Sequence, residues 1–567
     1  MSEFTYLKNN NAKLFDSLEK IVNLENNQNY IPLYNHFFEL NSNNSGKINL
    51  KTQKHIIEVI KKKNHNIYSS KITDSKGENT TSDIFFKFSP LVDPVNIVVG
   101  KYDGSNNIFT LPKHIDDVSA NKLFLDKNHY SYVDSFFSFL TDKFSNDNYF
   151  VHGLEFYGTF LCNQKNFIFN AIDDIDYINK YSYFNKNLKI NHTIDEEHLN
   201  LLSSYDSKTI KKPIKLQEGN ICDLDITDEI DLKYDSLFVD NKNENNESET
   251  IEMIYNKEIT SHSTTSRSST ASSKTSNTDD NVSELDDLDE DEDEDEDFDE
   301  DFDEDEDTLS TISEEAINIT VNKVPIQLIC METCEKTLDH LLINYEIEEN
   351  EFSAILMQVI MILITYQKHF KFTHNDLHTN NIMYTNTDKE YLYYCVNNTY
   401  YKVPTYGKIY KIIDFGRSIY TYNSKLLCSN SFSKIGDAYT QYNCEPYFNK
   451  NKPRIEPNYS FDLCRLACSI FDYIIRDYRD LTKIIKNDRI ADLINDWCTN
   501  DYGKNIMYKS DGSDRYTEFK SYKMISRTVH NHIPIKQLER EIFKQYIVPH
   551  KKIKKTVKIM NIDKMII

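Results

Sequence analysis

Oxygen-bearing side chains at two places in the chain have the types and spacing that phosphoryl transfer requires. Residues 374–381 read H-N-D-L-H-T-N-N, and the triplet D-F-G follows at 414–416. Such a reaction needs one carboxylate that meets the attacking hydroxyl, and hard oxygen ligands that hold Mg²⁺ on the phosphates. Asp376 suits the first role, whereas Asn381 and Asp414 suit the second. We therefore predict that Asp376 is catalytic and that Asn381 and Asp414 are metal ligands.

Both motifs, H-x-D-L-x-x-x-N and then D-F-G, stand in the order and beside the apolar strand-like runs that kinases show, so the chain resembles the protein kinase superfamily. The resemblance implies a bilobal α+β fold with a small β-rich N-lobe and a larger helical C-lobe. It also implies ATP and Mg²⁺ as cofactors, and serine/threonine-protein kinase activity on a protein substrate. The bias toward Asn, Ile, Lys and Tyr is similar to that of kinase-like proteins of giant DNA viruses.

Two positions in the first motif depart from the pattern of serine/threonine kinases. His378 stands where these kinases commonly have Lys, so the resemblance implies a γ-phosphate contact by His378, either protonated or as a neutral donor. Asn375 replaces an Arg that usually receives an activation-loop phosphate, which implies activity without such a phosphate. Two alternatives stay open, a small-molecule kinase of kinase-like fold and a pseudokinase scaffold that uses an acidic arm.

A lysine inside an apolar strand is a further candidate. Alternating residues predict strands at 66–72 and 83–88, and the second strand contains Lys87. A lysine is costly to bury unless it meets an anion. The resemblance implies that Lys87 binds the α- and β-phosphates of ATP. The alternative is an edge strand whose lysine points into water.

The kinase resemblance also implies a helix that presents an acid to Lys87. The apolar spacing predicts a helix over 130–144, in which Asp134 is the only early acid. Asp134 is therefore the predicted partner of Lys87, and the alternative is a solvated acid near a helix start. No G-x-G-x-x-G precedes this region, so a phosphate-covering loop would be degenerate.

A buried strand over 326–332 is predicted to lead into a helix that starts at 337–342. The resemblance implies that Met331 abuts the adenine and that the backbone around Glu332 bonds the adenine edge. Downstream, Asp462 is expected to cap a helix and to bond the backbone of the catalytic loop.

Apolar patterns predict several further elements. They are a short helix around 15–22, a strand pair at 150–162 and 166–172, a long helix over 352–368, and a hairpin at 391–395 and 400–403.

The stretch from about 196 to 318 has little apolar content, with Ser and Thr dominating 260–276 and acids dominating 279–307. It cannot bury enough apolar surface to offset its ordering entropy, so we predict a disordered acidic insertion in the N-lobe. The acidic residues at 279–307 account for most of the formal charge of −25. A solvated tract, an arm that binds a basic protein partner, and a site of regulatory phosphorylation are the readings that stay open.

These boundaries predict six segments. They are an N-terminal extension (1–50), the first part of the N-lobe (51–195), the insertion (196–318), the last N-lobe strand and hinge (319–334), the C-lobe (335–550) and a basic, solvated tail (551–567).

Composition also indicates in which compartment the protein is expected. The ten cysteines form no paired C-x-x-C motif, the start lacks a basic segment followed by an apolar one, and the apolar run 354–366 is too short to span a bilayer. We therefore expect an intracellular, cytoplasmic protein with reduced thiols, in the host cytoplasm or virion if the source is viral. Nothing in the sequence points to nucleic acid or a membrane as partner.

Overall fold

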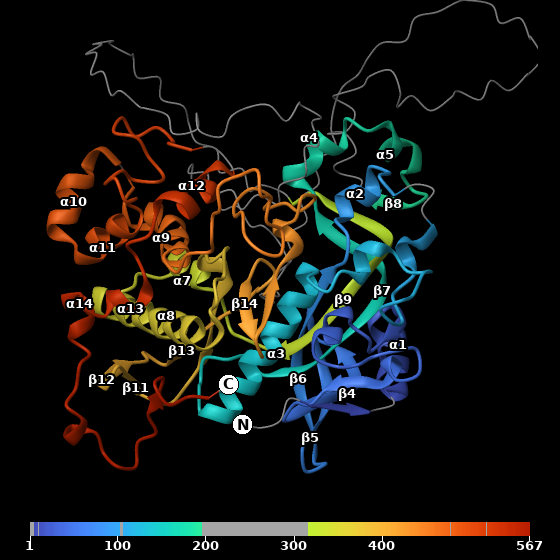
Figure 1. The fold of residues 1–567 in the computed structure, drawn as a ribbon, viewed down its shortest axis with the longest axis horizontal. Coiled ribbons are helices and arrows are strands. Elements are labelled where there is room, and N and C mark those ends of the chain that lie inside the picture. The colour runs from blue at the N-terminus through green and yellow to red at the C-terminus, as the bar shows by residue number, and fades with distance from the viewer. Residues whose placement is uncertain are drawn as a thin grey trace, which may run out of the picture.

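The fold is of the predicted α+β class, with a curled sheet on one side and most of the helices on the other (Figure 1). The structure is a computed structural model that describes residues 5–8, 11–102, 106–195, 316–476, 478–516 and 519–566. The predicted insertion at 196–318 lies outside the described residues except for its last three, and Asn318 already pairs with Asn170.

The sheet is antiparallel and is built from strands far apart in the chain. In spatial order the strands are β4 (Lys54–Lys62), β5 (Ile67–Asp74), β6 (Asn79–Pro90), β9 (Asn318–Glu332), β7 (Phe156–Asn170) and β2 (Leu24–Gln28), and β8 (His192–Ile194) pairs with the start of β9. The strands predicted around Lys87 are thus confirmed, and β6 lies between β5 and β9.

Helices cover both faces of this sheet. Helix α1 (Ala12–Val22) packs Leu14 and Leu18 in one apolar cluster with Phe86 of β6. Because side chains alternate along a strand, Lys87 faces the opposite side, where α3 (Tyr130–Asn148) lies. The predicted helices at 15–22 and 130–144 are confirmed, and α1 and β2 are packed with the sheet rather than apart from it.

One strand prediction was wrong. Residues 150–172 do not form a pair, because β7 is one continuous strand along β9. The polar stretch that suggested a turn contains Asn166, whose backbone is left-handed at φ 51°, yet the pairing with β9 resumes at Phe167. Strand β9 contains the strand predicted at 326–332 and begins eight residues earlier, at Asn318, because residues 318–321 alternate between half-buried and buried.

The helical part is arranged around α8 (Glu349–Phe370), which is buried on almost every side along Phe352–Gln367. Further helices of this part are α7 (Leu338–Asn344), α9 (Phe461–Ile474), α10 (Leu481–Asn487), α11 (Arg489–Trp497) and α12 (Lys520–Thr528), of which α11 packs against α8. Among the residues that the structure describes, no helix is both long and apolar enough to cross a membrane.

Shorter elements complete this part of the chain. They are β1 (Tyr6–Lys8), β3 (Ile48–Leu50), α2 (Pro94–Val98), α4 (Ile175–Ile178), α5 (Ser182–Asn187), β14 (Ile419–Tyr422), β15 (Lys425–Cys428), α13 (Pro534–Gln537) and α14 (Glu541–Lys544).

The predicted hairpin forms as β11 (Tyr391–Val396) and β12 (Thr399–Pro404), and the end of the chain packs on it. Strand β16 (Met560–Asn561) lies parallel to β11, and the Ile562 side chain beyond it is fully buried. The expectation of a solvated tail was therefore wrong for these last residues, although the lysines at 551–555 are exposed.

Candidate active site

A two-stranded ladder brings the two sequence motifs together. Strand β10 (Ile382–Asn386) follows the first motif, and β13 (Lys408–Ile412) precedes the second. These strands are antiparallel partners, and the N–H of Ile413 donates to the carbonyl of Asn381 at 3.0 Å. The last residue of the first motif therefore lies beside the start of the second.

Helix α9 holds the loop at 374–381 by hydrogen bonds to its backbone. The fully buried carboxylate of Asp462 accepts the N–H groups of His374 and Asn375, each at 2.9 Å. The predicted bond to the loop backbone is present, but Asp462 is not the helix cap, since α9 begins after Ser460. Burial raises the pKa of Asp462 above its usual range, an effect that the two N–H donors oppose.

Asn375 joins this loop to the segment that follows Gly416. Its backbone is left-handed (φ 64°), a conformation that Asn tolerates better than most residues. Its Nδ2 donates to the carbonyl of Arg417 at 2.9 Å, and its Oδ1 accepts from the Tyr442 hydroxyl at 2.8 Å. Asn375 therefore holds the loop and the downstream segment together without any added phosphate.

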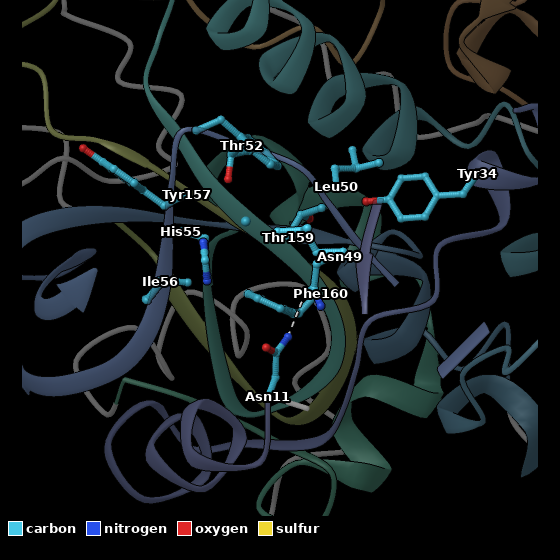
Figure 2. A pocket seen from close by; sticks show the side chains of 13 residues that line it. Asn11, Tyr34, Asn49, Leu50, Thr52, His55, Ile56, Tyr157, Thr159 and Phe160 are labelled. Carbon is cyan, nitrogen blue, oxygen red and sulfur yellow. Dashed lines mark hydrogen bonds between the residues drawn. The ribbon is translucent and has the colours of Figure 1, made fainter. Parts of the chain in front are cut away.

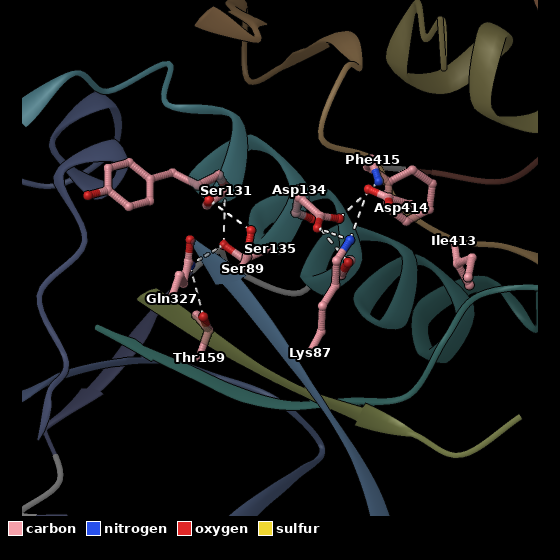
Figure 3. A network of polar contacts seen from close by, with 12 residues as sticks. Lys87, Ser89, Ser131, Asp134, Ser135, Thr159, Gln327, Ile413, Asp414 and Phe415 are labelled. Atoms are coloured by element: carbon pink, nitrogen blue, oxygen red, sulfur yellow. Dashed lines mark hydrogen bonds and ion pairs between the residues drawn. The ribbon is translucent and has the colours of Figure 1, made fainter. Parts of the chain in front are cut away.

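The buried lysine meets two carboxylates (Figure 3). Lys87 Nζ lies 2.7 Å from Asp134 Oδ2 and 2.9 Å from Asp414 Oδ1. The other oxygen of Asp134 accepts the N–H of Phe415 at 2.9 Å. The ion pair predicted between Lys87 and Asp134 is present, and neither side chain is solvated, since Lys87 is 6% and Asp134 2% exposed.

Asp134 on α3 thus makes two different contacts. One carboxylate oxygen holds the Lys87 ammonium, and the other fixes the backbone directly after Asp414. Asp414 has a left-handed backbone (φ 62°), a conformation that this contact helps to maintain. Burial opposes ionisation of Asp414, but the Lys87 ammonium outweighs it and holds the pKa of Asp414 below its usual range.

Asn381 and Asp414 fit the requirements of Mg²⁺. The Nδ2 of Asn381 donates to the carbonyl of Asp376 at 2.9 Å and lies 3.1 Å from His378 Nε2, which leaves Oδ1 for a cation. No group of three or more His, Cys, Asp or Glu within the described residues could hold a metal alone. Two protein oxygens completed by phosphate oxygens and water are, however, a usual Mg²⁺ environment.

Asp376 is held in its charged form by its neighbours. Its Oδ1 accepts from the Tyr522 hydroxyl at 2.8 Å, and its Oδ2 lies 3.6 Å from Arg417 Nη1. Burial alone would raise the pKa of Asp376, but the Arg417 guanidinium and other neighbours hold it well below its usual range. The side chain keeps 22% of its surface exposed, so a reacting group can reach it.

His378 is neutral at physiological pH. Burial lowers the pKa of His378 to about 4, although the nearby Asp376 carboxylate raises it. Since Nε2 accepts from the Asn381 amide, the ring proton is on Nδ1. Of the two roles expected for His378, the low pKa favours that of a neutral donor, and the γ-phosphate contact itself stays a prediction.

Glu332 is joined to the neighbouring chain segment by its backbone and its side chain. Its N–H donates to the carbonyl of Glu155 at 2.9 Å, so this N–H is not available to an adenine edge, and the expected contact by the backbone around Glu332 stays a prediction. Its carboxylate accepts the N–H of Glu155 and pairs with Lys411 of β13. This ion pair joins the large sheet to the ladder of β10 and β13. Met331 precedes it in β9 and is almost completely buried, between Phe85 and Phe156 on the two neighbouring strands.

Several contacts of the site were not foreseen from the sequence. Asn375 lies within the first motif and Arg417 directly follows the second, so their position was a signal. Arg465 and Tyr522 belong to no motif, and Tyr522 is 146 residues from Asp376 in the chain. Only the packing of α12 against α9 shows their involvement.

A separate pocket lies elsewhere, between the N-terminal segment and strands β4 and β7 (Figure 2). Asn49, Thr52, His55, Tyr157 and Thr159 are among the residues that line it. None of the predicted site residues lines this pocket. The candidate active site is therefore the constellation around Asp376 and Asp414.

Comparison of the sequence with models of protein families finds no match, and no curated protein matches it either. The function must therefore be argued from the side chains and their arrangement.

Proposed function

We propose that the chain is an ATP- and Mg²⁺-dependent serine/threonine-protein kinase with the bilobal kinase fold. One observation carries the proposal, namely that Lys87, Asp134, Asp376, Asn381 and Asp414 lie in one connected network although four separate segments supply them. Phosphoryl transfer is catalysed almost entirely by positioning and electrostatics, which is what such a network provides.

The arrangement of elements supports the proposal. The lysine strand β6, the acid-bearing helix α3 and strand β9, which leads into α7, occur in the order that the kinase resemblance implies. The sheet would be the N-lobe and the helices around α8 the C-lobe. The chain departs from the usual pattern in its Asp at 134 in place of Glu, and the geometry compensates, since Asp134 reaches Lys87 directly.

Each residue has a defined task in this proposal. Asp376 accepts the hydrogen bond of the attacking hydroxyl, aligns it, and receives its proton as the bond to phosphorus forms. Lys87 contacts the α- and β-phosphates and is itself oriented by Asp134. Asn381 and Asp414 would hold Mg²⁺, which neutralises charge on the phosphates when bound.

A small-molecule acceptor is the second candidate, and the state of His378 favours it. Serine/threonine kinases commonly place a lysine there, whereas a neutral His378 supplies no positive charge to the transferred phosphate. The reaction and the residues would be the same, and only the acceptor would differ.

The test uses the purified full-length chain with Mg²⁺ and ATP labelled at the γ-phosphate. A mixture of proteins and a mixture of small hydroxyl compounds are offered as acceptors in separate reactions. We expect label in protein at Ser or Thr, and its loss in Asp414→Asn. Asp16→Asn is the matched control, because it removes the same charge from an exposed ion pair on α1.

Label in the small compounds alone would favour the second candidate, a kinase with a small-molecule acceptor. Nucleotide binding without any transfer would favour the third reading, a scaffold. Equal label with wild type, Asp414→Asn and a blank would overturn the proposal altogether.

A further inference from the structure

We propose that Tyr522 is a positioning residue that holds the carboxylate of Asp376, and that Arg465 sets the direction of this contact. The inference rests on the proposed function and deepens it, because it explains how the reacting carboxylate is aligned. Tyr522 comes from α12 and Arg465 from α9, and neither belongs to a motif.

The hydrogen bonds form a one-way relay. Arg465 Nε donates to the Tyr522 hydroxyl at 2.9 Å, and this hydroxyl lies 2.8 Å from Asp376 Oδ1. A guanidinium has no acceptor, so the hydroxyl oxygen must accept from Arg465. Its single proton is then available to Asp376, and a carboxylate that is ionised can only accept it. The order Arg465, Tyr522, Asp376 is therefore fixed by the chemistry of the groups.

The tyrosine ring is held rigidly in place. Tyr522 is 2% exposed, and its ring stacks on Phe519 at a centroid distance of 5.5 Å. The guanidinium of Arg465 lies 5.0 Å from the ring centroid and that of Arg417 lies 5.7 Å from it, which are cation–π distances. Burial raises the pKa of Tyr522 to about 12, so the hydroxyl keeps its proton across the working pH range.

This arrangement assigns different tasks to the two oxygens of Asp376. Oδ1 is bound to Tyr522, so the carboxylate cannot rotate freely. Oδ2 lies beside Arg417 at 3.6 Å, and it is the oxygen left for an attacking hydroxyl. The donor from Tyr522 also stabilises the charged form of Asp376 and so contributes to its depressed pKa. Loss of that donor should loosen the orientation of the Asp376 carboxylate.

The test is Tyr522→Phe in the full-length chain, assayed for the kcat and the KM for ATP of transfer from ATP. Removing a hydrogen bond to a charged group should lower kcat by about tenfold to a hundredfold. The KM for ATP should stay unchanged, because Tyr522 does not contact Lys87 or the metal ligands. A loss of kcat at an unchanged KM is a change that a merely structural residue would not cause.

Tyr508→Phe is the matched control. Tyr508 is also buried, and its hydroxyl donates to Asp472 at 2.7 Å, away from the candidate site. Both variants should lose some thermal stability, but only Tyr522→Phe should lower kcat. Should that variant fail to fold, Arg465→Lys removes the Nε donor and keeps the charge, and it should lower kcat in the same way at an unchanged KM for ATP.

A double-mutant cycle sharpens the argument. In an Asp376→Asn background, Tyr522→Phe should have little further effect on kcat, since the two groups act as one unit. An additive effect of both changes would contradict the relay.

Failures of the two proposals are distinguishable. If transfer depends on Asp414 but Tyr522→Phe behaves like Tyr508→Phe, the relay is wrong and the kinase proposal stands. A faster Tyr522→Phe enzyme would also overturn the relay, because the hydroxyl would then obstruct the acceptor. If the wild type shows no transfer that depends on Asp414, both proposals fall together.

Discussion

At the scale of single residues, the candidate site is a set of charges that compensate one another in a mostly buried environment. Lys87 is shared between two carboxylates, and Arg417 lies between Asp376 and Asp437. Burying one such charge without its partner would be strongly unfavourable. Conservative substitutions that keep the shape of a side chain are therefore the most informative probes of this site.

Asp376→Asn keeps the shape of the side chain but removes its ability to accept a proton. We expect the transfer rate to fall by about 10²- to 10⁴-fold, the usual range for a positioned acid or base. ATP affinity should change little, because Asn381 and Asp414 are the residues proposed to face the metal. Transfer rate, nucleotide affinity and melting temperature should be measured on one preparation.

A purely structural role of Asp376 predicts a different pattern. Melting temperature and nucleotide affinity would then fall together with the rate. Near-normal transfer by Asp376→Asn would remove this residue from the chemistry.

Asp142, two turns beyond Asp134 on α3, gives a prediction that does not depend on function. Burial, with the Glu155 carboxylate nearby, raises the pKa of Asp142 to about 7. Between about pH 4 and 7 the folded chain thus retains a proton that the unfolded chain releases, so this group makes stability fall as pH rises. Asp142→Asn should stabilise the fold at pH 8, by an amount of the order of a few kcal/mol, and much less at pH 5.

Chemical unfolding of both proteins at several pH values checks this prediction. Asp147→Asn is the control, because it lies on the exposed side of the same helix. A difference in unfolding free energy that is the same at every pH would contradict the assignment.

At the scale of elements, the site is positioned by contacts between segments that are distant in the chain. The ladder of β10 and β13 aligns the two motifs, and α9 supports the loop from below. The end of the chain contributes as well. Lys368 of α8 pairs with Asp563 at 2.7 Å, and the backbone of Ile566 bonds the side chain of Asn148 at the end of α3.

Truncation after residue 558 should therefore destabilise the protein. It removes the buried side chains of Met560 and Ile562, and each such side chain contributes on the order of 2–5 kcal/mol in a packed core. Thermal melting measures the loss. Replacing the exposed lysines 551, 552, 554 and 555 by Gln is the control, and it should leave the melting temperature almost unchanged. Equal melting of the truncated and full-length chains would show that the end of the chain adds no stability.

At the scale of the whole molecule, one fold is assembled although a segment of low apolar content interrupts its sheet. Strand β8 precedes this segment and β9 follows it, and the two are antiparallel partners with Ile194 opposite Ile319. The points where the segment leaves and re-enters the described fold are therefore close together.

Replacing residues 197–314 by a short Asn-Gly linker should leave a cooperatively melting domain. The linker would close β8 and β9 as a hairpin, and the removed residues contribute few apolar side chains. Calorimetry and the labelled-ATP assay test stability and activity together. Aggregation, or loss of the thermal transition, would show that the removed segment is required by the fold.

The sequence by itself determined the features that depend on residues close together in the chain. The spacing of Asp376 and Asn381 within one loop, the lysine in β6 and the helical face around Asp134 are local patterns, and the corresponding elements and the Lys87–Asp134 pair are present in the structure. Local patterns also predicted α8 and the hairpin of β11 and β12, because backbone periodicity sets which side chains share a face.

Only the tertiary structure decided the contacts between distant segments. Asp462 does not cap its own helix as expected, and the N–H of Glu332 is taken by Glu155. Burial makes His378 neutral, and Tyr522 reaches Asp376 from 146 residues away. Hydrogen-bond partners and burial depend on which surfaces meet in the fold, and no spacing along the chain encodes that meeting.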